Sequence, residues 1–376
     1  MPEYRFTEFA INCTQKKKPT ENDKYTYIGL EHLDSGTLEV SRWGSDVAPI
    51  GEKLIMQKGD VLFGKRRAYQ KKVGIAPFDG IFSAHGMVLR PREEVITKEY
   101  FPLFISSDYF LNEAIRISVG SLSPTVNWKD LKDLTFNIPT IEEQKRIAPI
   151  IWAAIEAKNS YKYLIQSIDN LVKSQFIEMI GTVNYNPHNF NVVSIGDICR
   201  IMNGYAFQSK KYVKNGVKVI RITNVQKGEI VDNDPQYYPF DLMPEFSNYI
   251  LEEGDLLLSL TGNCGRVGLL PAEMCPAALN QRVACLKSDE QQINKMFLFA
   301  TLNTYLFEAD CMSAASGSAQ KNMSTEWLKK YKILLPPKEQ QLAFANFVEQ
   351  SDKSKFELQK SIEKIDNLIK SLIQQN

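Results

Sequence analysis

Ile168-Asp169-Asn170-Leu171-Val172-Lys173-Ser174 recurs almost unchanged 197 positions later, as Ile365-Asp366-Asn367-Leu368-Ile369-Lys370-Ser371. Each copy ends a long pattern that is typical of an α-helix. Other motifs return at nearly the same offset: the Gly59-Asp60 turn and its apolar run, for example, recur at Gly254-Asp255. A repeat of this length indicates one domain that has been duplicated, and not a solenoid of short units.

The two copies have the same order of expected strands. Polar and apolar residues alternate over 25–33 and 217–225, as in half-buried strands. The Gly-Asp turn and a buried strand follow in each copy. A third strand is predicted over 84–89 in the first copy and over 282–286 in the second.

Helices are expected after these strands. The segments 98–117 and 294–312 are rich in Phe and Leu, whose side chains are predicted to lie in the core. Each is followed by a polar loop that contains Gly and Ser, at 120–127 and 317–324. Residues 1–24 show no regular pattern and are predicted to be irregular.

Two long helices follow the loops. Thr140 and Glu143 have the spacing of a capping box, so the first helix is predicted to begin there and to end near Gly181. In the second helix, Pro337 suits the first helical position, where its missing N–H costs nothing. Glutamates in both first turns complement the helix dipole.

Apolar and small residues recur on both helices at alternating spacings of three and four, which predicts a heptad seam. Such long helices need a partner, and each copy supplies one for the other, so an intramolecular, antiparallel pair is expected. Two alternatives stay open: each helix packs on its own domain, or the seam forms a homodimer. The predicted seam residues are Ile147, Ile150, Ala154, Ala157, Tyr161, Leu164, Ile168, Leu171, Phe344, Phe347, Ser351, Ser354, Leu358, Ile365 and Leu368.

The predicted fold class is α+β, with two similar α/β domains separated by two long helices. The expected boundaries are a first domain over 1–139, a first helix over 140–181, a second domain over 182–336 and a second helix over 337–376.

Composition favours a soluble, intracellular protein. The formal net charge is only +1, so any surface for nucleic acid must be a local patch. The N-terminus lacks an apolar signal segment and no run is long enough to span a membrane, which predicts a cytoplasmic location. The six cysteines form no C-x-x-C pair, and with three histidines they make a metal site improbable.

Catalytic signatures are missing from both copies. The sequence has no phosphate-binding G-x-x-x-x-G-K-[ST], no H-E-x-x-H and no G-x-S-x-G. Gly262 to Gly268 is rich in glycine but matches none of these patterns. A binding scaffold is therefore favoured over an enzyme.

The loops that follow the Gly-Asp strands differ between the copies. The first is basic over 65–72, whereas the second is neutral and polar over 260–266. Arg and Lys can pair with phosphates or guanine, and Asn or Gln with adenine. A solvated loop and simple turn formation are the alternative explanations. Two copies of one fold with chemically different loops are what we expect of two domains that bind different targets.

These features resemble the specificity subunit of type I restriction–modification systems over essentially the whole chain. The most specific parts are the two helix starts, Ile138-Pro139-Thr140-Ile141-Glu142-Glu143-Gln144 and Leu335-Pro336-Pro337-Lys338-Glu339-Gln340-Gln341. The repeated helix ends and the twin Gly-Asp strands add to the resemblance. One departure is that the residues before Tyr25 do not resemble the stretch 203–207 of the second copy.

The resemblance implies a non-catalytic DNA-recognition subunit. Each domain would read one half of a bipartite double-stranded DNA site, and the antiparallel helices would set the gap between the halves. Two methyltransferase subunits would dock, and restriction subunits can join them. S-adenosylmethionine, Mg²⁺ and ATP would be held by these partner subunits, and this subunit itself would bind no cofactor. A two-headed protein-interaction adaptor with a coiled-coil dimerisation arm is the alternative.

With DNA as the ligand, the candidate contacts are the polar loop residues of both copies. In the first copy they are Lys65, Arg66, Arg67, Tyr69, Lys71, Lys72 and Ser123. In the second copy they are Arg221, Thr223, Asn224, Thr261, Asn263, Arg266, Gln281, Arg282, Gln320 and Lys321.

Overall fold

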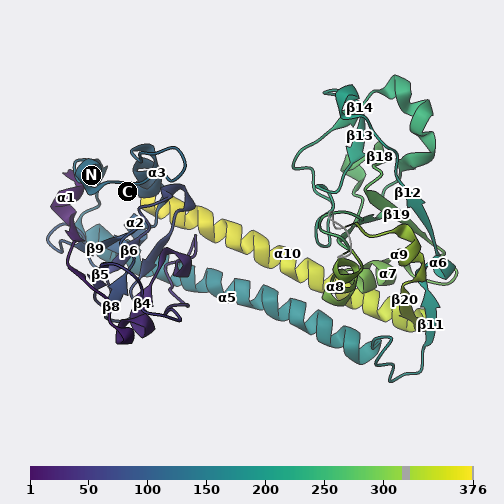
Figure 1. Ribbon diagram of the computed structural model, residues 1–376, viewed down its shortest axis with the longest axis horizontal. Coiled ribbons are helices and arrows are strands. Elements are labelled where there is room, and N and C mark those ends of the chain that lie inside the picture. The colour runs from purple at the N-terminus through teal and green to yellow at the C-terminus, as the bar shows by residue number, and fades with distance from the viewer. Residues whose placement is uncertain (316–321, 375–376) are drawn as a thin grey trace. The chain divides into compact units, whose positions relative to one another are not determined.

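The computed structural model describes residues 1–315 and 322–374 (Figure 1). The chain forms two compact units, the first made of Met1–Tyr163 with Leu358–Asn376 and the second of Leu164–Glu357. Each unit therefore contains one globular domain and a segment of both long helices. Among the described helices, none is both long and apolar enough to cross a membrane.

The first unit begins with regular structure, so the prediction that residues 1–24 are irregular is wrong. Strand β1 (Glu3–Arg5), helix α1 (Phe6–Phe9) and strand β2 (Ala10–Cys13) follow one another directly. The second domain begins in the same way, with β11 (Asn191–Ser194), α6 (Ile195–Ile198) and β12 (Cys199–Asn203). Elements of three to five residues are too short to show a periodic pattern, so the sequence alone did not predict them.

Each domain contains a four-stranded antiparallel sheet of the same order. In the first domain the order is β2-β9-β6-β7, with β6 (Val61–Phe63), β7 (Val73–Ile75) and β9 (Met87–Pro91). In the second it is β12-β19-β16-β17, with β16 (Leu256–Ser259), β17 (Val267–Leu269) and β19 (Val283–Ser288).

The aspartate of each Gly-Asp turn ties β6 or β16 to its neighbouring strand. Asp60 accepts two hydrogen bonds from Arg90 on β9, at 2.5 and 2.9 Å. Asp255 accepts one from Lys287 on β19 at 2.5 Å. Each carboxylate also accepts a backbone N–H from its own turn. The Gly-Asp motif is therefore explained by turn closure and strand pairing.

A second sheet in each domain is mixed. In the first domain its order is β3-β5-β8-β4, with β3 (Lys16–Lys17), β4 (Tyr27–Ile28), β5 (Lys53–Met56) and β8 (Gly80–Phe82). In the second it is β14-β13-β18-β15, with β13 (Val217–Ile220), β14 (Tyr237–Tyr238), β15 (Ile250–Leu251) and β18 (Ala277–Leu279). The parallel pairs β4–β8 and β13–β18 correspond, whereas β3 and β14 extend opposite edges.

The helices predicted over 98–117 and 294–312 are each broken in two. Helices α2 (Phe101–Ile105) and α3 (Asp108–Arg116) are separated at Ser107, whose side chain caps α3. Helices α7 (Lys295–Leu302) and α8 (Tyr305–Ala314) are separated at Thr304, which caps α8 in the same way. A capping hydroxyl stabilises a helix start, and here it outweighs the continuous apolar pattern. The predicted burial of the Phe and Leu side chains is confirmed: Phe101, Phe104, Phe110, Leu111, Phe297, Phe299, Leu302 and Phe307.

A short helix and a last strand lead into each long helix. They are α4 (Trp128–Leu131) and β10 (Thr135–Asn137) in the first domain, and α9 (Thr325–Lys330) and β20 (Lys332–Leu335) in the second. Strand β10 pairs with β1 and β20 pairs with β11. The beginning and the end of each globular domain are thereby joined.

The long helices begin close to the predicted residues. Helix α5 (Ile141–Met179) has the predicted capping box, because Thr140 N–H donates to Glu143 and Glu143 N–H donates to the Thr140 hydroxyl. Gly181 lies just beyond the helix end in the left-handed conformation, with φ of 87°. Helix α10 (Lys338–Gln374) begins one residue after Pro337, which therefore precedes the helix instead of occupying its first position.

A buried glutamine in the first turn fixes each long helix to its own domain. The Gln144 side chain accepts the Thr97 N–H at 2.7 Å and donates to the carbonyls of Val95 and Pro139, both at 2.8 Å. Gln341 accepts the Asn294 N–H at 2.7 Å and donates to the carbonyls of Gln292 and Pro336. The exposed fractions of the two side chains are 0% and 1%.

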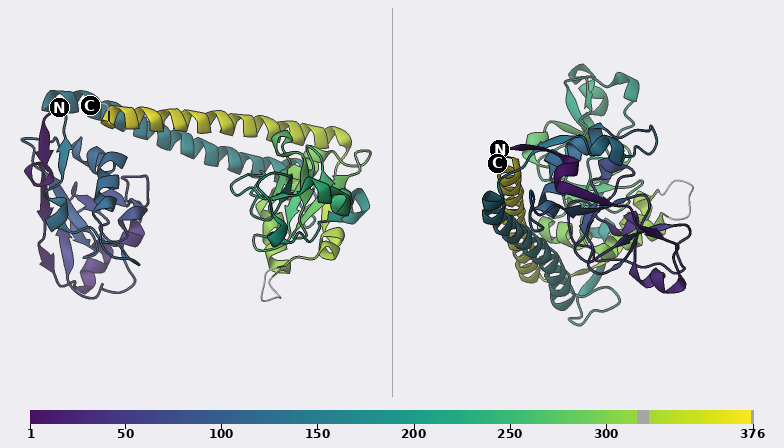
Figure 2. Two further views of the ribbon diagram at one scale, coloured as in Figure 1. Left: turned by 90° about the horizontal axis from the view of Figure 1, so that it is seen from above. Right: turned by 90° about the vertical axis from the view of Figure 1, so that its left-hand side faces the viewer.

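The two long helices pack together in antiparallel directions, as predicted. In the first unit, Lys158 of α5 pairs with Asp366 of α10 at 2.5 Å, and Ile151 and Ile373 belong to one core cluster. Figure 2 shows the yellow C-terminal turns of α10 beside the first half of α5. In the second unit, Asp169 pairs with Lys355 at 3.0 Å and the Phe176 and Phe344 rings lie 5.5 Å apart. The two ion pairs occupy equivalent positions of the repeat.

Ten of the fifteen predicted seam residues are buried or half-buried, and at the other five the next residue in the chain is the more buried one. Ile151 is buried and Val172 is half-buried, for example, whereas the predicted residues Ile150 and Leu171 are exposed. One residue corresponds to about 100° around a helix, so the two residues of each such pair lie on adjacent faces. Ile147, Phe344 and Ser351 are buried as predicted. The half-buried seam residues are Ala154, Ala157, Tyr161, Ile168, Phe347, Leu358 and Ile365. The exposed ones are Ile150, Leu164, Leu171, Ser354 and Leu368.

We predict that Gln144→Leu lowers the free energy of unfolding of the first unit by about 3 kcal/mol, because it leaves one N–H and two carbonyls buried without partners. Urea denaturation measures the change. Gln341→Leu should act in the same way on the second unit. The matched control is Gln166→Leu, on the exposed face of α5, which should change the unfolding free energy by less than about 0.5 kcal/mol. An equally small loss in Gln144→Leu would contradict the assigned role.

Candidate nucleic-acid interface

In the first unit, the basic loop and the Gly-Ser loop that were singled out in the sequence lie against each other. Val126 N–H donates to the Lys65 carbonyl at 2.9 Å, and Arg67 N–H donates to the Pro124 carbonyl at 2.7 Å. Arg66 and Thr125 form an isolated β-bridge between them. The backbone therefore holds two loops, more than fifty residues apart in the sequence, as one surface.

The basic loop has an unusual backbone conformation. Arg67 and Lys71 flank a short 3₁₀ turn, Ala68–Gln70, and both are left-handed, with φ of 55° and 51°. Such a conformation costs a residue with a side chain roughly 1 kcal/mol, so neighbouring contacts must hold it in place. Tyr69 projects from this turn, and 53% of its surface is exposed.

The cations of this loop fall into two groups. Arg66 and Arg67 are exposed, and within residues 1–315 and 322–374 neither forms an ion pair. Arg67 does reach the Ser123 hydroxyl, at 3.4 Å. Burial, together with the nearby positive charge of Lys16, lowers the pKa of Lys65. Cations gathered without carboxylates form a site that attracts anions.

Lys71 and Lys72 belong to the second group, whose charges are used within the protein. Lys71 pairs with Asp108, the first residue of α3, at 2.6 Å. Its hydrogen bond is the main reason that the pKa of Asp108 is lowered. Lys72 donates to the Leu30 carbonyl at 2.7 Å. Their assignment as DNA contacts stays a prediction, but both already stabilise the domain.

His85 was missed by the sequence reasoning. Its side chain is exposed and its carbonyl accepts the Arg66 N–H at 3.2 Å, which places it beside the basic loop. The signal was present in the repeat, because His85 precedes the candidate residue Arg282 by the same 197 positions that separate the two helix ends.

The second unit brings the equivalent loops together. Met323 N–H donates to the Leu260 carbonyl at 2.8 Å, and Thr261 forms a bridge with Asn322. Leu260 N–H donates to the Arg282 carbonyl at 3.0 Å, so that segment lies on the same surface. The side chains of Asn263, Gln281 and Arg282 are exposed here, and Thr261 is half-buried. Gln320 and Lys321 lie outside the described residues.

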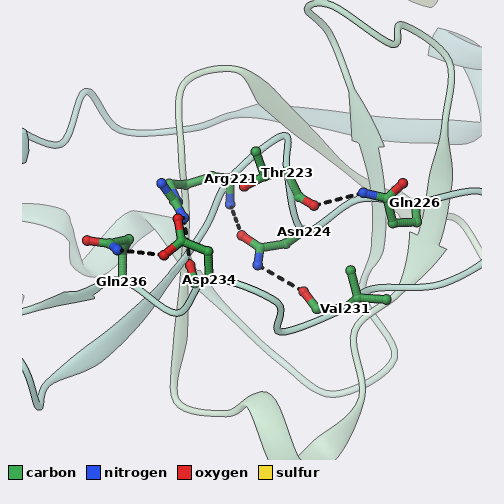
Figure 3. A network of polar contacts seen from close by, with 7 residues as sticks. All are labelled: Arg221, Thr223, Asn224, Gln226, Val231, Asp234 and Gln236. Carbon is green, nitrogen blue, oxygen red and sulfur yellow. Dashed lines mark hydrogen bonds and ion pairs between the residues drawn. The ribbon is translucent and has the colours of Figure 1, made fainter. Parts of the chain in front are cut away.

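The other candidates of the second unit form a network within one loop (Figure 3). Arg221 pairs with Asp234 at 2.7 Å, and this hydrogen bond is the main reason that the pKa of Asp234 is lowered. Asn224 is 3% exposed, accepts the Arg221 N–H and donates to the Val231 carbonyl. The Thr223 carbonyl accepts a hydrogen bond from Gln226. Arg221 and Asn224 therefore shape the loop, whatever else they contact.

Arg266 is likewise engaged within the second unit. Its guanidinium donates to the Gln226 side chain at 2.6 Å and lies 4.0 Å from the Glu308 carboxylate. The surface of the second unit thus presents Thr261, Asn263 and Gln281 beside the exposed cation Arg282, whereas that of the first unit presents the adjacent exposed arginines Arg66 and Arg67. Equivalent backbone positions display different hydrogen-bonding chemistry in the two units.

The comparisons with known proteins match this duplicated architecture. A family model described as the type I restriction modification DNA specificity domain matches residues 8–170 and again residues 187–367. The chain belongs to this family. It is a specificity subunit of a type I restriction–modification system, the non-catalytic DNA-recognition component, which confirms the resemblance seen in the sequence. The adaptor alternative is not favoured.

Several relatives can be aligned with nearly the whole of this chain. The MjaVIII specificity subunit of Methanocaldococcus jannaschii is 25% identical over 371 residues, which cover 92% of this chain and 85% of that protein. The EcoKI specificity subunit of Escherichia coli K12 is 25% identical over 398 residues, with 94% and 79% covered.

Solved structures share the fold. A chain from a study of complex assembly and conformational transition of the type I R-M system has a TM-score of 0.62 at 19% identity, with 99% of this chain and 96% of that chain covered. The S subunit from M. genitalium has a TM-score of 0.59 at 13% identity, with 99% and 95% covered.

We predict that Arg67→Gly separates stability from DNA binding. Glycine adopts the left-handed conformation without strain, so the free energy of unfolding should rise by up to about 1 kcal/mol while DNA affinity falls. Thermal denaturation and a filter-binding assay measure the two effects. Arg66→Gly is the matched control, since Arg66 does not have positive φ; it should weaken DNA binding and also lower stability. Equal stability changes in the two variants would contradict the strain at Arg67.

Proposed function

We propose that each unit reads one half of a bipartite, asymmetric DNA site. The observation that carries this proposal is the pair of equivalent loop surfaces with unequal chemistry. In the first unit, Lys65, Arg66 and Arg67 offer cations for phosphates or guanine. In the second, Asn263 and Gln281 offer amides that suit adenine. Two different readers recognise two different half-sites.

The antiparallel helices are the spacer in this proposal. Each helix is fixed to its own domain by a glutamine in its first turn, so a change in helix length would be transmitted to the domain. Helix α5 has 39 residues and α10 has 37. The number of unread base pairs between the half-sites follows from this length.

Two methyltransferase subunits dock on the subunit, one for each unit. A groove in the first unit is lined by Ser107 and Asp108 of the α3 start and by Lys158 and Lys370 of the long helices. The second unit has the same groove, in which Thr304, Tyr305, Lys355 and Lys173 take these positions. Lys370 lies 3.6 Å from Asp108, whereas Lys173 faces the Tyr305 ring.

Apolar side chains on the outer face of the helices supply further docking surface. Ile150 and Leu368 in the first unit, and Leu164 and Leu171 in the second, each have nearly half of their surface exposed. Two equivalent sites support two copies of one partner. S-adenosylmethionine, Mg²⁺ and ATP are held by the methyltransferase and restriction subunits, and the complex acts on DNA in the cytoplasm.

We predict that replacing Lys65, Arg66 and Arg67 together by Ala weakens DNA binding and reduces the slope of log affinity against log salt by about 0.9 for each lost phosphate contact. Filter binding on duplex DNA over a range of salt concentrations measures the slope. Lys98, which is exposed in the first unit and lies 3.9 Å from the neighbouring Glu99, provides the control variant Lys98→Ala. An unchanged slope in the triple variant would contradict the proposal that these three side chains contact phosphates.

We also predict that inserting seven residues at opposite points of α5 and α10 widens the recognised spacer by about three base pairs, since seven residues add about 10.5 Å and one base pair occupies about 3.4 Å. Seven residues preserve the heptad register of the pair. Methylation mapping by the complex with its methyltransferase reads the spacer. Insertion into α5 alone is the control and should abolish methylation. A recognised spacer of unchanged length in the double insertion would refute the proposal that helix length sets the distance between the half-sites.

A further inference from the structure

A small β-hairpin projects from the first unit beside the basic loop. Val119 and Thr125 exchange both backbone hydrogen bonds, at 3.0 and 2.9 Å, and so close the hairpin 119–125. Thr125 also forms the bridge with Arg66 described above. The base of the hairpin is therefore held by the neighbouring segment on one side.

The tip of this hairpin is apolar. Leu122 lies there, and 90% of its surface is exposed, while Val119 at the base is 60% exposed. A leucine left in water forgoes the favourable free energy of burying its side chain. A single exposed leucine needs no explanation by itself. Here, however, it stands at the tip of a hairpin closed by one β-bridge, whose neighbours Arg66 and Arg67 are exposed cations without carboxylate partners among the described residues.

Duplex DNA matches this combination of shape and charge. The major groove is about 12 Å wide and admits a two-stranded β-ribbon, whose strands lie about 4.8 Å apart. Arginines along the side of a ribbon can reach the phosphates that border the groove. The tip then meets base edges. Leucine cannot form hydrogen bonds, and the apolar group that bases display in the major groove is the C5-methyl of thymine.

We propose that the hairpin 119–125 is the major-groove reading element of the first unit and that Leu122 reads a thymine methyl in its half-site. This assignment rests on the proposed function, because it deepens the reading of DNA by the first unit. It makes Leu122 a specificity-determining residue, whereas Arg66 and Arg67 supply affinity that does not depend on sequence.

The test replaces each thymine of the recognised site, one at a time, by deoxyuridine, which lacks only the methyl group. Competition binding by the full-length subunit in complex with its methyltransferase gives the affinities. One thymine in the half-site of the first unit should show a loss of about fourfold, the value of one buried methyl. In Leu122→Ala the same replacement should have no effect. Leu122→Met, which keeps an apolar tip, should retain most of the difference.

Two controls keep the outcomes apart. Ile50→Ala removes an aliphatic side chain of the same unit that is 94% exposed, and it should leave the loss at that thymine unchanged. Thymines in the other half-site should respond equally in the wild type and in Leu122→Ala. These controls show whether the effect belongs to Leu122 and to one half-site.

Three results would overturn the proposal. A half-site without a methyl-sensitive thymine is one, and methyl sensitivity that persists in Leu122→Ala is another. The third is a Leu122-dependent rise in 2-aminopurine fluorescence without methyl sensitivity, which would identify a wedge between base steps instead. Each of these leaves the proposed function intact if the complex still prefers its site. A complex without any sequence preference would refute the proposed function itself.

Discussion

The buried amide of one glutamine in each half fixes the direction in which a long helix leaves its domain. Gln144 and Gln341 each satisfy one backbone N–H and two carbonyls that burial has removed from water. Such groups are costly to leave without partners, so the helix start and the domain are joined as one rigid piece. The groove beside each helix pair, its ion pair and any role as a spacer depend on this joint.

Duplication repeats the framework and leaves the recognition chemistry free to differ. The carboxylate of the Gly-Asp turn accepts two hydrogen bonds from Arg90 in one domain and one from Lys287 in the other. Tyr305 in the second unit is equivalent to Asp108 in the first. Lys370 therefore forms an ion pair with Asp108, whereas the equivalent Lys173 lies over the Tyr305 ring. Loops held at equivalent places by backbone hydrogen bonds accept almost any side chain, which suits a protein whose units recognise different targets.

Much of the fold followed from local signals. The Thr140 capping box, the Gly181 stop and the burial of the Phe-rich segments are local properties, and the structure confirms them. The breaks at Ser107 and Thr304 were missed, because a single capping hydroxyl interrupted a continuous apolar pattern. The seam was misplaced by one residue at Ile150, Leu164, Leu171, Ser354 and Leu368, because the residues on adjacent faces of a long helix compete for burial and only the packing around the helix decides between them.

The sequence by itself determined the duplication, the two long helices, the absence of a recognisable catalytic motif and the loops that carry polar side chains. Only the tertiary structure decided which of those side chains remain free. Lys71 meets Asp108 and Arg221 meets Asp234, whereas Arg66 and Arg67 face outward. The physical reason is that charge pairing depends on distance in space, and residues far apart in the chain come within reach of each other only after it folds.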